Sequence, residues 1–266
     1  MTLSNLGGPI FLGWLSGLSD SGLRYQLESS YRMIPLPGRF MKELAAARSD
    51  FMQGVGIYYW IDEAGARHGK GMIIGPEDTP YAFCPLVFEL HCPTDYPFSP
   101  PKVEFKTSDG VTRFHPNLYV TGKVCLSILG TWQGPKWSPA LTLSTVLTSI
   151  QSLLESNPIV NEPGWENFTL ENPRAKAYAG AVQFRLLALT LKDLEAWKGG
   201  NTPAIWKEFE EVLEKRGDEL YEKLLGIVRI KAEQDEQLFE NVPYGITGIT
   251  GWKDLRKEKL AKENGL

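Results

Sequence analysis

Apolar residues recur along the chain in two different spacings, which predict a group of strands between two helical regions. After a breaker cluster at residues 35–38, Phe40, Leu44, Ala47 and Phe51 lie at helical spacing and predict a first amphipathic helix. Runs of β-branched, aromatic and alternating apolar residues then predict four short strands. These strands cover residues 55–61, 71–74, 86–92 and 102–106.

The four predicted strands are joined by short segments rich in turn residues. Residues 75–78 and 97–101 are two such clusters. Because parallel pairing requires long crossover connections, the short links favour an antiparallel meander. Strands followed by a run of helices indicate the α+β class.

The stretch from Phe114 to Pro139 has no apolar period. A long structureless segment inside a compact domain is commonly functional. A strong helical stripe follows it and ends before Asn157–Pro158. The stripe consists of Leu143, Val146, Leu147, Ile150, Leu153 and Leu154.

The last third of the chain has helical periodicity. One apolar stripe runs from Ala175 to Leu189, and Thr202–Pro203 is a plausible cap and first turn of a further helix. The segment 192–240 is acidic, which indicates solvated helix faces or, alternatively, an acidic partner surface. A Gly-rich break at 244–252 precedes a charged segment, 253–263, which predicts a short exposed helix.

We therefore expect three regions: a lead-in at 1–36, a core at 37–170 and a helical extension at 171–266. The lead-in holds a short apolar run, Pro9–Leu15, expected to pack on the core or else to touch a membrane or partner. It is much shorter than the roughly 20 residues of a membrane span, so no spanning segment is predicted and a membrane is not among the expected partners. With 42% hydrophobic residues, a net charge of −4 and no basic stripe, nucleic acid is not an expected partner.

The chain has three cysteines, and no two of them have metal-ligand spacing. The spacing predicts no metal site. An odd count of cysteines favours a reducing compartment, so the cytoplasm or the nucleus is expected. Cys84 and Cys92 fall in or beside strand-like segments and are expected to be buried. Cys125 lies in the aperiodic stretch, where a loop can present its thiol at the surface.

The residues around Cys125 resemble a known family. His115–Pro116–Asn117, followed ten residues after the histidine by Cys125 within Gly122–Leu126, is similar to the active-site block of ubiquitin-conjugating enzymes. Further blocks in the same order extend the resemblance over residues 39–165. They are residues 75–81, 93–101 and 137–154.

A narrower similarity points to one branch of that family. Residues 125–132 and 157–165 resemble the long-tailed branch, which works with the second, non-standard ubiquitin-activating enzyme. The resemblance implies a UBC-like fold, with the four-stranded meander, flanking helices and a helical C-terminal extension. It also implies that Cys125 accepts ubiquitin or a ubiquitin-like modifier from an activating enzyme as a thioester. The modifier then passes to a lysine amine of a protein substrate or to a ubiquitin ligase, with no organic cofactor, because the activating enzyme uses the ATP.

The resemblance also implies roles near the cysteine. Asn117 would stabilise an oxyanion or, equally, hold the loop through hydrogen bonds to the backbone. His115 and Pro116 would support the loop. Glu162, with Asn161 as the runner-up, would orient the acceptor lysine, although a plain surface glutamate fits Glu162 as well.

Three further positions match the surface on which the family docks ligases. Phe98, Pro139 and Ala140 belong to this set, and an exposed Phe98 would be an aromatic anchor. Ordinary turn packing is the alternative for Phe98. Trp132 and Trp137 are expected to support the loop.

Two other function classes remain open. A non-catalytic ubiquitin-binding adaptor of the same fold would lack the cysteine, and Cys125 argues against it. A Cys–His hydrolase would need a base beside the thiol and an orienting group, and no such signature surrounds the chain's histidines. One departure from the family concerns the bend after Tyr81, where Phe83–Cys84 replaces the usual pair of glycines.

Overall fold

The computed structural model describes residues 38–62, 65, 67–234, 238–239 and 242–263. The chain divides into two compact units, residues 1–42 and 43–266. Only residues 38–42 of the first unit are described, and they begin helix α3 (Gly38–Ala47). The apolar run Pro9–Leu15 lies outside the described residues.

The predicted first helix is two helices, and Phe51 is not on its buried face. Helix α3 ends at Ala47, and α4 (Asp50–Gly54) starts anew after Ser49, whose side chain accepts a hydrogen bond from the N–H of Met52. Because the helix begins again at Asp50, the residues of α4 do not continue the apolar face of α3. Met52 is therefore buried while Phe51 is 74% exposed.

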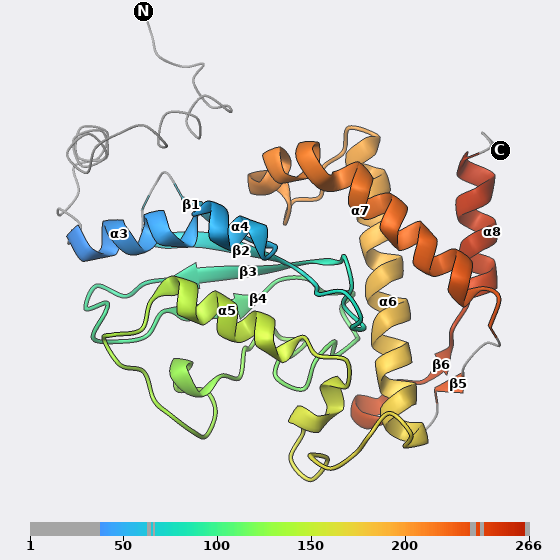
Figure 1. The fold of residues 1–266 in the computed structure, drawn as a ribbon, viewed down its shortest axis with the longest axis horizontal. Helices are drawn as coiled ribbons and strands as arrows, with labels where there is room; N and C mark the ends of the chain where they lie inside the picture. Colours follow the sequence, from blue (N-terminus) through green and yellow to red (C-terminus); the bar gives the residue numbers. More distant parts are fainter. Residues whose placement is uncertain (1–37, 63–64, 66, 235–237, 240–241, 264–266) are drawn as a thin grey trace, which may run out of the picture. The chain divides into compact units, whose positions relative to one another are not determined.

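The sheet confirms the predicted antiparallel meander and the α+β class. Its strands are β1 (Ile57–Ile61), β2 (His68–Ile74), β3 (Pro85–His91) and β4 (Lys102–Phe105). They pair in sequence order, each antiparallel to the next (Figure 1). Strands β2 and β3 are mostly buried, as central strands must be.

Helix α5 (Leu143–Leu153) lies against the sheet and closes the core over β2. The helix approaches closely at Gly71, where an added Cβ would lie 2.6 Å from a methyl carbon of Leu147 and would force that side chain to shift. Thr142 caps the helix by accepting a hydrogen bond from the N–H of Thr145. The predicted stripe is confirmed at Leu143, Val146, Leu147 and Ile150, which are fully buried.

The C-terminal helices are α6 (Pro173–Lys198), α7 (Glu210–Lys231) and α8 (Trp252–Glu263). Asn172 caps α6, and Pro173 occupies its first turn. Helix α7 begins after Thr202–Pro203 and the short 3-10 helix η3 (Lys207–Phe209), so the predicted start was too early. Trp206, in the turn before η3, and Phe209, in η3, are both buried.

The last segment forms the predicted helix, but one face of that helix is buried rather than exposed. Lys259 of α8 is only 3% exposed, and its ammonium lies 2.7 Å from the carboxylate of Glu195 in α6. Trp252 packs edge-to-face on Phe184 of α6, with ring centroids 4.9 Å apart. Helix α8 thus packs on α6 although most of its residues are charged, because Trp252 and the paired Lys259 face α6.

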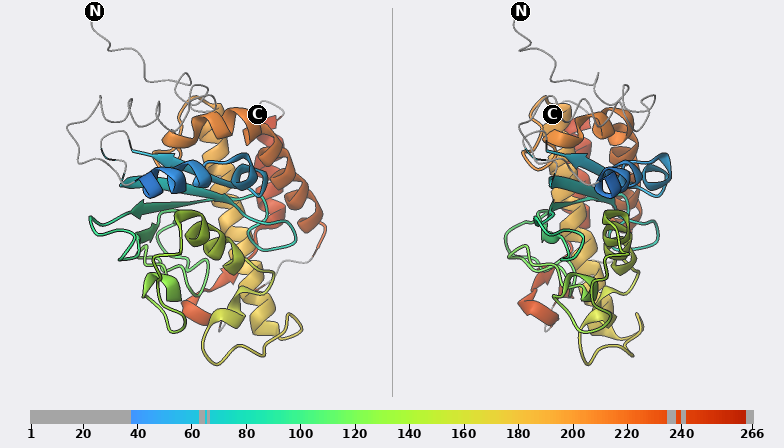
Figure 2. Two further views of the ribbon diagram at one scale, coloured as in Figure 1. Left: turned by 60° about the vertical axis from the view of Figure 1, so that its left-hand side comes forward. Right: turned by 90° about the vertical axis from the view of Figure 1, so that its left-hand side faces the viewer.

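Helix is interrupted between α7 and α8, as the Gly-rich segment 244–252 predicts, and a two-stranded ribbon that was not predicted lies there. Its strands are β5 (Leu238–Phe239) and β6 (Gly248–Ile249), which pair antiparallel around the short 3-10 helix η4 (Pro243–Gly245). Figure 2 shows this ribbon near α6, and the ribbon contacts that helix.

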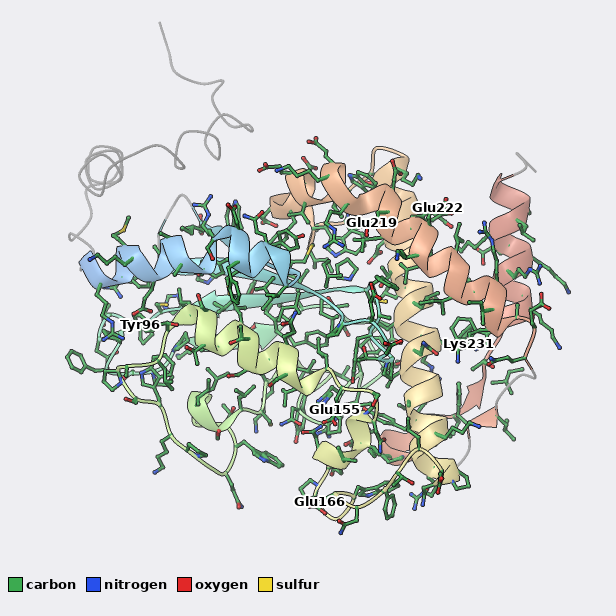
Figure 3. The ribbon with its side chains drawn as sticks, viewed as in Figure 1. Tyr96, Glu155, Glu166, Glu219, Glu222 and Lys231 are labelled. Carbon is green, nitrogen blue, oxygen red and sulfur yellow. The ribbon has the colours of Figure 1, made fainter. Side chains whose placement is uncertain are left out.

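The sheet and the C-terminal helices lie within one compact unit, residues 43–266. Lys70 of β2 pairs with Glu208 at 2.5 Å, and Arg216 of α7 donates to the hydroxyl of Tyr58 in β1 at 3.2 Å. Other charges of α7, including Glu219 and Glu222, are labelled in Figure 3. None of the helices in the described part of the chain combines the length and apolar composition that crossing a bilayer requires.

Candidate active site

The candidate site is a loop that follows β4 and is fastened by isolated β-bridges. His115 bridges to Leu118, and Leu118 bridges in turn to Val124. Gly122 turns the loop back with a φ of +90°, and its missing side chain leaves room for the carbonyl of Phe105, 3.1 Å from where a Cβ would be. The aperiodic stretch is thus ordered by backbone pairing that apolar spacing does not reveal.

Cys125 is tied to Asn117 by two hydrogen bonds. The N–H of Cys125 donates to the carbonyl of Asn117 at 2.8 Å, and the side-chain amide of Asn117 donates to the carbonyl of Cys125 at 2.7 Å. Asn117 is itself buried. This is the loop-holding contact expected as one of two roles for Asn117.

The expectation that the loop presents Cys125 at the surface was wrong. The residue is only 1% exposed. Its backbone pairing with Asn117 holds it against the buried segment 114–118, and the 3-10 helix η1 (Ser127–Leu129) follows two residues later.

Thr131 closes the loop on the other side of Cys125. Its hydroxyl donates to the carbonyl of Val124 at 2.7 Å and accepts from the N–H of Leu126 at 2.9 Å. One hydroxyl thus connects the two residues that flank Cys125. Sequence reasoning missed this clamp, and a lone threonine in an irregular stretch gives no signal for it.

His115 is fully buried and faces the loop backbone rather than a reactive group. Its Nδ1 accepts a hydrogen bond from the N–H of Asn117 at 2.9 Å. Burial lowers the pKa of His115 to about 3, against a smaller opposing effect of the Leu153 backbone. A neutral imidazole with Nδ1 occupied fits a loop-supporting role and does not fit the base of a Cys–His hydrolase.

Pro116 is buried, and its carbonyl accepts a hydrogen bond from the guanidinium of Arg113. The same guanidinium lies over the ring of Tyr119 at 3.6 Å and over the ring of Tyr244 at 4.2 Å. Arg113 is a second residue that sequence reasoning missed. Its partner Tyr244 is far away in the sequence, which is why no local pattern indicates the contact.

Glu162 and Asn161 lie at the end of the 3-10 helix η2 (Pro158–Asn161), and both side chains already have partners. The Glu162 carboxylate accepts a hydrogen bond from the hydroxyl of Tyr244. The Asn161 amide donates to the carboxylate of Glu155, labelled in Figure 3, at 2.7 Å. An action of either residue on an acceptor lysine stays a prediction.

The three predicted ligase-docking residues lie on two loops joined by Trp137. Pro139 and Ala140 are exposed, and Phe98 is 77% exposed, which argues against turn packing as its role. The indole N–H of Trp137 donates to the carbonyl of Pro97 at 2.7 Å, next to Phe98. Trp137 thus supports these loops as expected, and the docking role of the three residues stays a prediction.

The other two cysteines are buried, as predicted. Burial raises the pKa of the Cys84 thiol to about 12, partly offset by a hydrogen bond with Thr190. Burial also raises the pKa of the Cys92 thiol to about 12. Both thiols are therefore poor nucleophiles near neutral pH.

The bend before Cys84 keeps an unusual conformation although it lacks the expected glycines. Phe83 has a φ of +63°, a region that glycine adopts more easily. The hydrogen bond from the N–H of Phe83 to the carbonyl of Gly75, at 3.0 Å, fixes that geometry. In the described part of the chain, no group of three or more His, Cys, Asp or Glu residues could hold a metal ion.

Comparison with known proteins gives the family. The sequence profile described as "Ubiquitin-conjugating enzyme" matches residues 39–179. "Ubiquitin-conjugating enzyme E2 Z" of Danio rerio is 39% identical over 175 residues, 65% of this chain and 52% of that protein. The human protein of the same name is 57% identical over 96 residues, 36% of this chain and 27% of that protein.

A human protein named "Dual E2 ubiquitin-conjugating enzyme/E3 ubiquitin-protein ligase BIRC6" is 52% identical over 103 residues, 36% of this chain and 2% of that protein. The chain thus spans about half the length of the zebrafish relative and less of the two human ones. These relatives agree with the long-tailed branch inferred from residues 125–132 and 157–165. The matched profile covers more than half of the chain, and with it the whole loop from His115 to Cys125, so this protein belongs to the ubiquitin-conjugating enzyme family.

Proposed function

We propose that the protein accepts the activated C-terminus of ubiquitin, or of a ubiquitin-like modifier, as a thioester on Cys125. It then transfers the modifier to a lysine amine or to a ligase. The observation that carries this proposal is the pairing of Cys125 with Asn117 inside the His115–Pro116–Asn117 loop. Family membership supports the same reaction.

The chemistry consists of two acyl transfers on one sulfur. In the first, the Cys125 thiol gives up its proton, its thiolate attacks the carbonyl of the modifier's thioester on the activating enzyme, the C–S bond to that enzyme breaks, and the leaving thiolate takes up the proton. In the second, a neutral lysine amine attacks the Cys125 thioester, a C–N bond forms, the C–S bond breaks, and the Cys125 thiol is restored with a proton from the amine. This is covalent catalysis in two steps, and the protein contributes position and charge stabilisation.

Access to Cys125 requires a local opening of the loop. The hydrogen bonds of Thr131 to Val124 and Leu126 close the segment after Cys125, and they are few enough to break without unfolding the core. We propose that docking of the activating enzyme or of the modifier's extended C-terminal tail breaks this closure. The closed loop would then protect the thiol from oxidation between turnovers.

The partners proposed are those that the reaction needs: a modifier, an activating enzyme, a ligase and substrate lysines. The exposed Phe98 beside the Trp137-supported loop is the proposed ligase contact, because exposed aromatic residues are common interface anchors. Three free cysteines support a reducing compartment, the cytoplasm or the nucleus. Fluorescence microscopy of the tagged full chain tests the location.

A charging assay tests the proposed function. The chain is incubated with ATP, a modifier and each candidate activating enzyme, and the products are separated with and without reductant. We expect one adduct that reductant removes, a reductant-resistant ester with Cys125→Ser, and an unchanged adduct with Cys84→Ala. If no combination gives a reductant-sensitive adduct, the proposal fails.

A further inference from the structure

A connected set of side chains links the C-terminal extension to the candidate active-site loop. Tyr244, in the 3-10 helix η4 between β5 and β6, contacts both Arg113 and Glu162. Arg113 in turn holds the carbonyl of Pro116. Asn117 follows directly and holds the carbonyl of Cys125.

Two aromatic rings contact the guanidinium of Arg113. This guanidinium lies over the ring of Tyr119, from the loop, at 3.6 Å from the centroid and over the ring of Tyr244, from the extension, at 4.2 Å. A guanidinium stacked on aromatic faces has a fixed plane, which fixes the direction of its N–H groups. Removal of the Tyr244 ring would take away one of these two contacts and weaken the constraint on the N–H that donates to Pro116.

Helix α6 holds the residues just before His115 from the same side. The hydroxyl of Tyr178 donates to the carbonyl of Arg113 at 2.8 Å, and Arg185 donates to the hydroxyl of Thr112 at 3.0 Å. Arg185 also donates to the carbonyl of Thr247 at 2.8 Å. The rings of Tyr178 and Tyr244 pack edge-to-face, 5.6 Å apart. The extension therefore contacts the segment 112–116 at several points.

We propose that Arg113 is a positioning residue for Asn117, and that Tyr244 of the extension, anchored by Glu162, holds Arg113 in place. Arg113 acts through the backbone between Pro116 and Asn117 and does not touch the reacting atoms. Glu162 serves as the hydrogen-bond acceptor for Tyr244. This inference rests on the proposed function, because the loop it positions is the loop of the proposed transfer.

The inference makes a distinction between the two steps of the reaction. Accurate placement of Asn117 is needed when the amine attacks, and misplacement by a fraction of an ångström is costly there. We expect Tyr244→Ala and Arg113→Lys each to slow discharge of the charged protein to free lysine about tenfold. Initial charging should stay within about twofold of the native rate, because in that step the activating enzyme itself holds the thioester in position.

Glu162 provides a sharper test, since two roles predict different results. A glutamine at this position still accepts a hydrogen bond from the Tyr244 hydroxyl but has no charge. As an anchor for Tyr244, Glu162→Gln should discharge to lysine at a near-native rate while Glu162→Ala is slow. Equal loss in both variants would mean that the carboxylate charge acts on the lysine, which contradicts the anchor role.

Tyr221 gives a matched control elsewhere in the extension. Its ring lies 4.6 Å from the ammonium of Lys198, and its hydroxyl donates to Glu195 at 3.4 Å, so it has a cation and a carboxylate as partners just as Tyr244 does. Tyr221→Ala should leave lysine discharge unchanged. Melting temperatures of all variants report on folding, and Tyr244→Leu replaces Tyr244→Ala if the latter does not fold.

The deciding experiment measures discharge of the purified, charged full chain to free lysine in single turnovers, in native and Asn117→Ala backgrounds. If Tyr244 acts through Asn117, Tyr244→Ala should be slow alone but have less than a twofold effect in the Asn117→Ala background. The inference would be overturned if Tyr244→Ala discharges to lysine at the native rate, or if it slows discharge tenfold in both backgrounds. Failure of the native chain to charge would instead count against the proposed function.

Discussion

The side-chain amide of Asn117 holds the carbonyl of Cys125 at 2.7 Å, while the carbonyl of Asn117 accepts from the N–H of Cys125 at 2.8 Å. The two residues are eight positions apart and are joined as tightly as paired strands. A displacement of Asn117 should therefore move Cys125 as well. The site is best regarded as one closed loop rather than as separate groups.

Asn117→Ala should slow lysine discharge by about 100-fold, the scale of losing one oxyanion donor. It should also lower the free energy of unfolding by about 1 kcal/mol, because one buried hydrogen bond is lost. Single-turnover discharge and urea unfolding measure the two effects.

Asn157 is the matched control for that variant. Its side-chain amide also donates to a backbone carbonyl, that of Phe168, at 2.6 Å, and Asn157 lies in the loop after α5. Asn157→Ala should lose a similar amount of stability and keep its discharge rate. Equal discharge rates for the two alanine variants would contradict a special role of Asn117.

Thr131→Val should make Cys125 more accessible. Valine keeps the shape of threonine but loses the hydroxyl that joins Val124 and Leu126, so the loop opens more often. Alkylation by iodoacetamide, followed by mass spectrometry of each cysteine, should show faster modification of Cys125. The buried Cys84 and Cys92 should keep their rates, and an unchanged rate at Cys125 would show that Thr131 does not close the loop.

Stability should fall in mild acid because of His115. Its pKa is about 3 in the fold and about 6.5 in the unfolded chain, so the unfolded chain binds the proton first as the pH falls. The contribution is fully present above pH 6.5 and is lost as the pH drops toward 3, by about 1.4 kcal/mol per pH unit.

The free energy of unfolding, measured from pH 7 to pH 4.5, tests this contribution. His115→Gln should lower the stability at pH 7 yet flatten its decline with acid, whereas the exposed His68→Gln should keep the native slope. A native slope in His115→Gln would assign the acid sensitivity to other groups.

Phe98→Ala should affect only the step that needs a ligase. The side chain is 77% exposed, so its removal should change the free energy of unfolding by less than about 0.5 kcal/mol. Charging should be native, while ligase-stimulated discharge should fall about tenfold or more, as at an interface hot spot. Phe51→Ala removes an equally exposed ring, 74% exposed, and should leave that stimulation intact.

Periodicity alone predicted the meander sheet, helix α5 and the helical extension. It failed where capping or tertiary contacts decide the outcome: Ser49 restarts a helix and turns Phe51 outward, and the Glu195–Lys259 pair buries a charged residue of α8. The site followed from a motif that brings His115, Asn117 and Cys125 together. Thr131, Arg113 and Tyr244 could not be found in this way, because their contacts join residues that no local pattern relates.

The most direct test of the central claim is to locate the modifier on the charged protein. After reaction with an activating enzyme, ATP and the modifier, intact-mass and peptide mass spectrometry under mildly acidic, reductant-free conditions should place the modifier's terminal glycine on Cys125, with Cys84 and Cys92 unmodified. An adduct confined to another residue, or a reductant-sensitive adduct that persists in Cys125→Ala, would contradict the account.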